Sequence, residues 1–308
     1  MKKFIGSVLA TTLILGGCST MENESKKDTK TETKSVPEEM EASKYVGQGF
    51  QPPAEKDAIE FAKKHKDKIA KRGEQFFMDN FGLKVKATNV VGSGKGVEVF
   101  VHCDDHDIVF NASIPFDKSI IDSDSSLRSE DKGDDMSTLV GTVLSGFEYR
   151  AQKEKYDKLY EFFKDNEEKY QYTGFTKEAI NKTQNSGYEN EYFYISTIPY
   201  NLTEYRNYFE PLLNKSNSEF SKEMSNVKKQ LKDKSKVSVT TTLFSKNKNY
   251  TKKSNSENVI KMAEEIKKEK DLPTDIDFSI QFSDNKINTI KPNYSSKDNS
   301  EYGVFDNE

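Results

Sequence analysis

The sequence predicts an α+β fold, built from antiparallel strands and long amphipathic helices, on three observations. Residues 97–103 and 108–114 alternate between apolar and polar side chains, the period of half-buried antiparallel strands. Residues 136–151 place apolar side chains three and four apart, the period of a helix with one buried face. Helical and alternating segments follow in the order α-β-β-β-α and then β-α-α-β-α-β, which favours one α+β body or two abutting halves that meet near residue 170.

The first half, residues 44–168, is predicted to open with a helix. Pro52 and Pro53 suit the start of this helix, and Gly82 suits its end. Two or three strands follow between residues 84 and 114, with a turn at residues 92–96. A long acidic loop at residues 117–135 then leads to the helix that begins near residue 136, which the pattern extends to about residue 165.

The second half, residues 169–293, is predicted to mix strands and helices. Its alternating segments lie at residues 191–198, 236–244 and 275–282. Helices are expected at residues 202–213 and 219–232, and a third opens with Ser254 and Glu257 at the spacing of a capping box. Residues 294–308 are polar, and we expect them to form a loose tail.

The N-terminus carries the clearest functional signal. Lys2 and Lys3 precede an apolar run at residues 4–15, which has the length of a signal peptide and is short for a membrane span. The run ends in Leu15-Gly16-Gly17-Cys18, which resembles a bacterial lipobox: a Leu, two small residues and a Cys that lipoprotein maturation enzymes recognise. The alternative is an ordinary secretory signal peptide in which this Cys is incidental.

The lipobox resemblance implies lipidation. Residues 1–17 would be removed as a lipoprotein signal peptide, and Cys18 would become the first mature residue with an S-diacylglyceryl group, and an N-acyl chain where one is added. Two or more acyl chains anchor a protein stably where one is marginal. Residues 18–43 would then be the lipidated Cys and a flexible tether, because residues 19–43 are polar and lack an apolar period.

The net charge disfavours nucleic acid as a partner, and residue usage indicates a bacterium without an outer membrane. The net charge is −4, and loss of Lys2 and Lys3 would make it −4 − 2 = −6, so a nucleic-acid partner is not expected. Arg occurs at only four positions while Lys and Asn are abundant, which is typical of a low-GC Gram-positive bacterium. We therefore expect a lipid-anchored protein at the cell membrane that faces the outside of the cell.

The chain as a whole resembles a known lipoprotein family. The lipobox, the polar tether, residues 45–53 (YVGQGFQPP) and the layout of the body are similar to the Lys-rich, Trp-free staphylococcal lipoproteins that form a family of unknown function. The resemblance implies a surface lipoprotein. It brings no catalytic residues.

The densest group of metal-ligand residues lies at residues 102–107. It holds two of the three His, a Cys and three Asp, and imidazole and thiolate suit zinc or copper. A tight turn at residues 104–107 would bring together His102, His106 and Asp107 as candidate ligands, while alternation places Cys103 on the face opposite His102. The alternative is a solvated hairpin turn with a half-buried Cys.

Other motif-like segments lack required positions. Residues 92–96 resemble a P-loop, but Asn89 and Gly96 stand where Gly and Ser/Thr are needed. Asp122 begins a calcium-like loop whose sixth and twelfth positions are Leu127 and Gly133 in place of Gly and Glu. No catalytic residue and no cofactor are therefore expected, and we predict that the protein is not an enzyme.

Aromatic residues concentrate in the middle of the chain. Ten of the fifteen Tyr lie between residues 156 and 208. Exposed, they would suit glycan stacking or protein contacts; buried, they would be ordinary core and rim. The sequence thus favours a lipid-anchored envelope lipoprotein without enzymatic activity, whose partner is an envelope protein or glycan. The alternative is an extracytoplasmic ligand- or metal-binding module that uses the turn at residues 102–107.

Overall fold

A computed structural model describes residues 36–130, 133–134, 136–231, 237–247, 252–292 and 300–305. Cys18, the predicted signal peptide and most of the predicted tether lie outside the described residues. Residues 36–308 form one compact unit. The mixed α+β class is confirmed, as one body with no division near residue 170.

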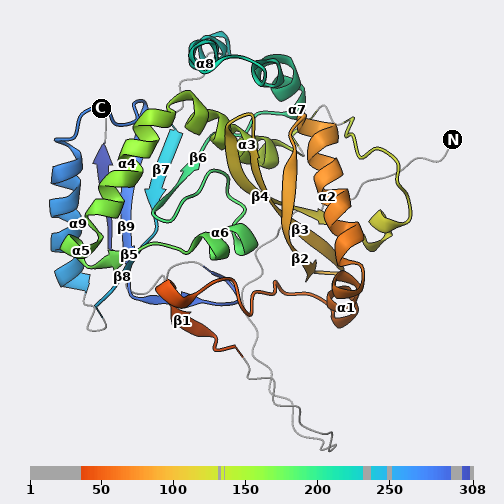
Figure 1. Cartoon of the computed structure of the whole chain (residues 1–308), viewed down its shortest axis with the longest axis horizontal. Helices are drawn as coiled ribbons and strands as arrows, with labels where there is room; N and C mark the ends of the chain where they lie inside the picture. Colours follow the sequence, from red (N-terminus) through yellow and green to blue (C-terminus); the bar gives the residue numbers. More distant parts are fainter. Residues whose placement is uncertain are drawn as a thin grey trace, which may run out of the picture. The chain divides into compact units, whose positions relative to one another are not determined.

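A three-stranded antiparallel meander forms one part of the body (Figure 1). Its strands are β2 (Val85–Ser93), β3 (Gly96–Asp105) and β4 (Ile108–Phe116), as the alternation predicted. Helices α1 (Lys56–Lys64), α2 (Lys66–Phe81) and α3 (Ser137–Ala151) pack on it. The approach of α2 is close, because a Cβ at Gly73 would lie 2.6 Å from Val99.

Two helices that the sequence predicted as continuous are broken. His65 separates α1 from α2, and Gln152 separates α3 from α4 (Lys153–Asp165); both residues have non-helical backbone angles. The break at Gln152 lets successive turns bury different faces. Phe147 of α3 packs in the core beside the meander, whereas Phe163 of α4 packs in a second core.

The second sheet contains parallel pairs that the alternation did not predict. It comprises β5 (Tyr172–Thr173), β6 (Phe193–Ser196), β7 (Val237–Thr241), β8 (Leu243–Ser245), β9 (Ile276–Ser283) and β11 (Ser300–Phe305). β7 and β8 both pair with β9 in parallel, with Val237 opposite Ile276 and Leu243 opposite Phe282. The offset is the same, so β7 and β8 are one strand interrupted at Thr242. Helix α9 (Lys252–Ile266) makes the crossover from β8 to β9, and it begins two residues before the predicted cap.

A short extended segment joins the two sheets. The backbone N–H of Asn111 in β4 donates to Gly187 O (2.8 Å), and Gly187 N–H donates back to Asn111 O (3.0 Å). On the other side, Ile195 N–H of β6 donates to Tyr188 O (2.9 Å). This segment therefore makes one continuous run of strands from β2 to β11, which explains why no domain boundary lies between the predicted halves.

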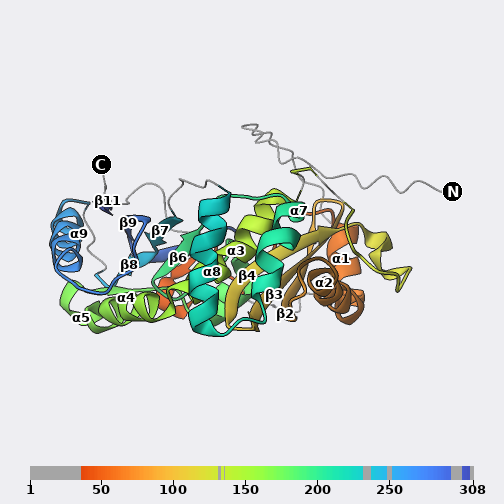
Figure 2. The ribbon, with the colours of Figure 1, turned by 90° about the horizontal axis from the view of Figure 1, so that it is seen from above.

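Helices lie on both sides of these strands. Figure 2 shows α4, α5 (Glu167–Tyr170) and α9 at the end of the body that holds β9, with α8 (Asn217–Gln230) beside α3. A helical segment made of α7 (Leu202–Glu204), a π-helical turn (Tyr205–Phe209) and a 3-10 turn (Glu210–Leu212) leads into α8. The opposite face of β2 and β3 is covered by α6 (Lys177–Thr183).

The ends of the body differ from the predicted boundaries. β1 (Glu39–Glu41) pairs with β10 (Lys286–Asn288), so the ordered body includes residues assigned to the tether. β11 pairs with β9, and Val304 is buried, so part of the predicted loose tail is an ordered strand. β1 has only three residues, and its partner lies more than 240 residues away in the sequence, so no local pattern reveals it. β11 follows a polar stretch and is the last strand of the chain's described part, so the polar composition of residues 294–308 concealed it. Within the described residues, no helix has the length and apolar content needed to cross a bilayer.

Candidate functional site

The hairpin turn between β3 and β4 carries two of the three predicted metal ligands. β3 ends at Asp105 and β4 begins at Ile108, so His106 and Asp107 form a two-residue loop. Both have positive φ, 53° for His106 and 59° for Asp107, as a type I′ turn requires. His106 Nε2 lies 3.8 Å from Asp105 Oδ2. The tight turn is therefore confirmed.

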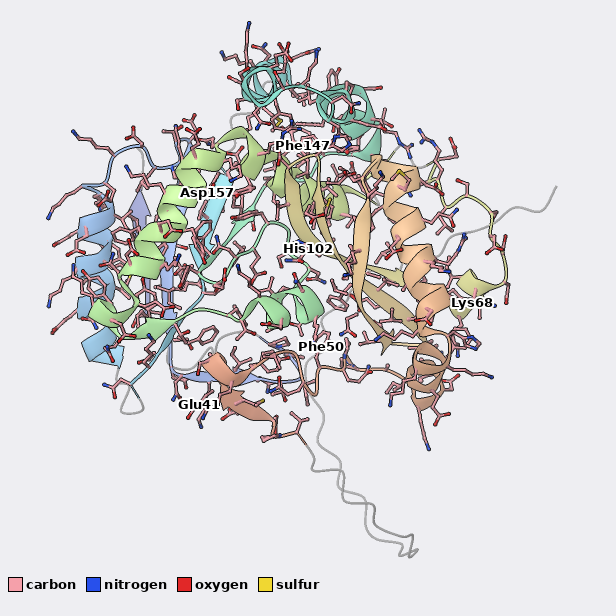
Figure 3. The ribbon with its side chains drawn as sticks, viewed as in Figure 1. Glu41, Phe50, Lys68, His102, Phe147 and Asp157 are labelled. Atoms are coloured by element: carbon pink, nitrogen blue, oxygen red, sulfur yellow. The ribbon has the colours of Figure 1, made fainter. Side chains whose placement is uncertain are left out.

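The third predicted ligand lies away from this turn. His102 pairs in register with Asn111, and its Nδ1 lies 3.0 Å from Asn111 Oδ1. Three strand residues separate His102 from the end of β3, about 10 Å at the usual rise. Figure 3 places His102 near the middle of the body, and β3 there contacts α6.

Cys103 lies on the other face of β3, as the alternation predicted. It is fully buried in the core beneath α2 and α3, and its Sγ donates to Lys84 O at 3.5 Å. Burial raises the pKa of the thiol to about 12, so it stays protonated and is a poor metal ligand. No group of three His, Cys, Asp or Glu side chains in the described part of the chain is arranged to hold a metal ion. The geometry thus gives no support to the predicted metal site.

The acidic loop that follows β4 is held against α2. Arg72 Nε donates to Ile120 O (3.1 Å), and its Nη1 donates to Ser125 O (2.9 Å). Further along the loop, Asp79 Oδ2 accepts from the backbone N–H of Leu127 at 2.6 Å. These bonds use polar side chains of α2 to position the backbone, and we find in them no calcium-binding arrangement.

The tyrosine-rich segment is core and rim. The Tyr149 and Tyr188 rings stack with centroids 4.0 Å apart, and Tyr156 packs beside both. Burial raises the pKa of all three phenols. Of the ten tyrosines between residues 156 and 208, the buried ones are Tyr156, Tyr170, Tyr172, Tyr188, Tyr192 and Tyr205, and the half-buried ones are Tyr160, Tyr194, Tyr200 and Tyr208. The structure favours the packing alternative, because none of the ten is exposed.

Buried polar groups gather on the face of the second sheet that points away from α4. Glu189 follows Tyr188 in the joining segment and, by alternation, faces the same side as Tyr194, its bridge partner. Burial alone raises the pKa of the Glu189 carboxyl to about 8, so the group is mostly neutral at pH 7. No local pattern singled it out, because Glu189 stands in the mixed run Tyr188-Glu189-Asn190-Glu191, before most of the predicted strand at residues 191–198.

Three further oxygens on this face are buried without a hydrogen-bond partner. They are Thr242 Oγ1, Gln281 Oε1 and Ser283 Oγ. Gln281 and Ser283 alternate with Phe282, whose ring points to the core under α4, and Thr242 falls opposite Gln281 by the offset of β7 and β9. Hydroxyls and a neutral carboxyl are groups that hydrogen-bond buried water or a small polar ligand.

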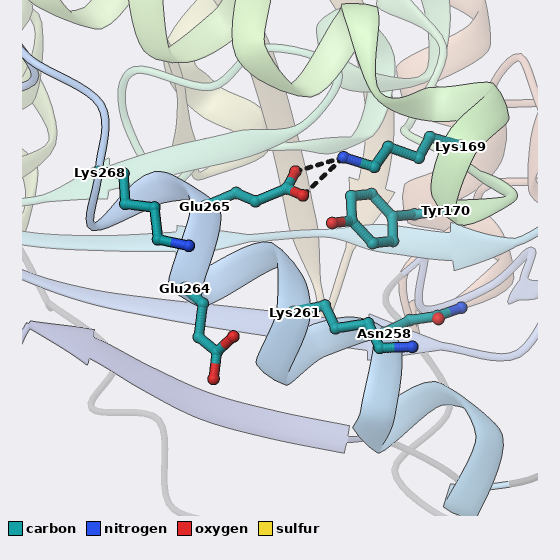
Figure 4. Close-up of a pocket in the computed structure, with 7 residues that line it drawn as sticks. All are labelled: Lys169, Tyr170, Asn258, Lys261, Glu264, Glu265 and Lys268. Carbon is teal, nitrogen blue, oxygen red and sulfur yellow. Dashed lines mark hydrogen bonds and ion pairs between the residues drawn. The ribbon is translucent and has the colours of Figure 1, made fainter.

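A shallow depression of about 320 Å³ lies between α5 and α9 (Figure 4). It is lined by Lys169, Tyr170, Asn258, Lys261, Glu264, Glu265 and Lys268. Lys169 Nζ lies 2.6 Å from both carboxylate oxygens of Glu265, and this pair lowers the pKa of Glu265. Two of the charges in the wall of this depression thus pair with each other, and its lining is mostly charged, unlike the apolar lining of a typical ligand pocket.

Comparisons with known proteins identify the family. A family model described as a protein of unknown function, DUF1672, matches residues 32–308. The chain belongs to the DUF1672 family. A crystal structure of a DUF1672 family protein from Staphylococcus aureus is 70% identical, with a TM-score of 0.87, and the match covers 89% of this chain and 100% of that one. No protein with a curated description matches this DUF1672 chain. The expected kinship with a staphylococcal family of unknown function is confirmed to that extent.

Proposed function

We propose that this DUF1672 protein is an exported lipoprotein, held in the cell membrane by lipid on Cys18 and facing the outside of the cell. Its body would act by binding an envelope protein or glycan, without catalysis. Nucleic acid is disfavoured as a partner by the net charge of −4.

The lipobox carries this proposal. Leu15-Gly16-Gly17-Cys18 stands directly after an apolar run of signal-peptide length, with Lys2 and Lys3 before it. Residues 19–35 then separate Cys18 from the first described residue, Val36. Membership of a family with a staphylococcal representative agrees with the Gram-positive residue usage.

The surroundings of His65, His102 and Cys103 support a binding role. The His65 ring packs on Phe61 with centroids 4.5 Å apart, and His102 is hydrogen-bonded to Asn111. Cys103 is buried with a protonated thiol. A nucleophile needs a base within hydrogen-bond reach and access to substrate, and none of these three side chains meets both needs.

The test is metabolic labelling in a Gram-positive host with an alkyne fatty acid. We expect the full chain to take up label and to sediment with membranes, and Cys18→Ala to lose both properties. Cys103→Ala is the matched control, because it removes the chain's other thiol and should keep label and sedimentation. An unlabelled wild-type chain, or a Cys18→Ala chain that stays with membranes, would refute the lipid anchor.

A further inference from the structure

We infer that one corner of the body rests on the lipid surface. This apolar corner consists of Val36, Val46 and Ile290, next to the point where the described chain begins. The inference rests on the proposed lipid anchor, and it names the surface of the body that faces the membrane.

Hydrogen bonds and packing bring the three residues to one corner. A Cβ built at Gly49 would lie 2.8 Å from Val36, so Val36 covers the turn that begins at Val46. Thr289, the neighbour of Ile290, donates from Oγ1 to Pro37 O at 2.9 Å. Thr289 O in turn accepts from the hydroxyl of Tyr45, the neighbour of Val46, at 3.2 Å. The corner lies beside β1, at the lower edge of the body in Figure 1.

These side chains are unusually exposed for their type. Val36 is 40% exposed, Val46 38% and Ile290 44%. The other described large apolar side chains with such exposure lie on different elements: Met78 on α2, Ile260 on α9 and Tyr302 on β11. Clustered exposed apolar side chains mark contact surfaces, whereas single ones need no explanation.

The charges around the corner are balanced. Four lysines lie on the segments that form it, and three glutamates lie beside them. The lysines are Lys44, Lys182, Lys286 and Lys291, and the glutamates are Glu38, Glu39 and Glu41. Lys44 pairs with Glu41 (2.7 Å) and Lys286 with Glu39 (3.2 Å). Asp284, which accepts from Lys286 N–H at 3.0 Å, brings the balance to zero, so the corner adds no net repulsion from an anionic bilayer, and its lysines are attracted to the headgroups.

The predicted tether would make so small a corner sufficient. A coil of the length between Cys18 and Val36 would span about 23 Å on average. Linking at this range gives an effective concentration of about a millimolar. A contact with a dissociation constant near a millimolar, far too weak to recruit a free protein, would therefore be made about half of the time.

The experiment couples the full chain through the Cys18 thiol to a maleimide lipid in vesicles of phosphatidylcholine and phosphatidylglycerol. The other thiol, Cys103, is buried and protonated, so coupling is selective. Hydrogen exchange is then followed at Val46 and Ile290, whose N–H groups donate only to nearby side-chain oxygens of Gln48 and Asn288. We expect exchange there to slow by up to about twofold relative to uncoupled chain with the same vesicles.

Two variants and the coupling chemistry separate the outcomes. The triple change Val36→Thr, Val46→Thr and Ile290→Thr should abolish the slowing, whereas Met78→Thr with Ile260→Thr should preserve it. Equal exchange in coupled and uncoupled wild type, or slowing that survives the triple change, would overturn the contact. Chemical coupling bypasses cellular lipidation, so such a result would leave the lipid anchor standing, and a failed labelling experiment would leave the contact testable.

Discussion

At the residue scale, the four arginines of the chain share one structural role, which depends on the several N–H donors of the guanidinium group. Each donates to backbone carbonyls that close a loop or a helix end. Arg72 donates to the carbonyl oxygens of Ile120 and Ser125, and Arg128 to that of Asp79. Arg150 donates to the carbonyl oxygens of Leu213 and Lys215, and Arg206 to that of Ser129. Arg150 also lies 4.1 Å from the centroid of the Phe220 ring, which fixes α8 to α3. Lysine, a point charge on a flexible stem, occupies the surface instead.

Glu189 provides the prediction at this scale. Its pKa is raised from 4.5 to about 8, so the folded chain binds a proton there that the unfolded chain releases. The stability from this group is full below pH 4.5 and is lost as the pH rises towards 8. Each unit of pKa difference corresponds to about 1.4 kcal/mol, so at pH 8 the raised pKa of Glu189 lowers the free energy of unfolding by about 4 kcal/mol.

The neutral isostere Glu189→Gln should remove this cost. We expect the variant to be more stable than wild type at pH 8, by up to about 4 kcal/mol, and about equal to it near pH 4.5, in urea unfolding at each pH. Glu264→Gln, on the exposed side of α9, should show no comparable pH-dependent gain. A gain for Glu189→Gln of the same size at both pH values would contradict the assignment of burial as the cause.

At the element scale, strand pairings could be predicted where the two strands lie close together in the sequence. The meander from Val85 to Phe116 was predictable because its strands are consecutive and its turns are short. The parallel pairing of β7 with β9 could not be predicted in this way, because helix α9 lies between the two strands in the sequence. Alternation of apolar and polar residues also does not distinguish parallel from antiparallel pairing. The same limit applied to the site: local spacing predicted the turn at His106, but not the buried face of Glu189, whose neighbours come from three strands.

β11 gives the prediction at this scale. A chain that ends at residue 299 would lose the pairing with β9 and the burial of Val304, which is 1% exposed. Burial of a Val side chain is worth about 1.5 kcal/mol or more, and the uncovered edge of β9 adds to the loss. We expect a drop of about 3 kcal/mol in the free energy of unfolding. Tyr302→Thr, an exposed change in the same strand, should cost less than about 1 kcal/mol. Unchanged stability of the shortened chain would mean that this segment is a tail after all.

At the scale of the body, the two predicted halves, residues 44–168 and 169–293, are tied together in three ways. The core beside the meander draws on residues from Ala62 to Phe147 and again from Leu202 to Val227. The joining segment is hydrogen-bonded to β4 and to β6. Glu148 of α3 is buried and accepts from Lys228 of α8 at 2.8 Å and from Gln152 at 2.8 Å. Neither predicted half therefore contains a complete core.

We accordingly expect residues 36–308 to unfold in one transition. Far-UV circular dichroism and tyrosine fluorescence should give the same urea midpoint, because either core loses its packing when the other opens. Val143→Ala in the first core and Val239→Ala in the second should each lower both midpoints together, by the same amount for both probes. Separate fragments 44–168 and 169–293 should remain unfolded. Two resolved transitions, or a midpoint that moves for one probe alone, would show that the strands joined at Gly187 behave as two domains despite their hydrogen bonds.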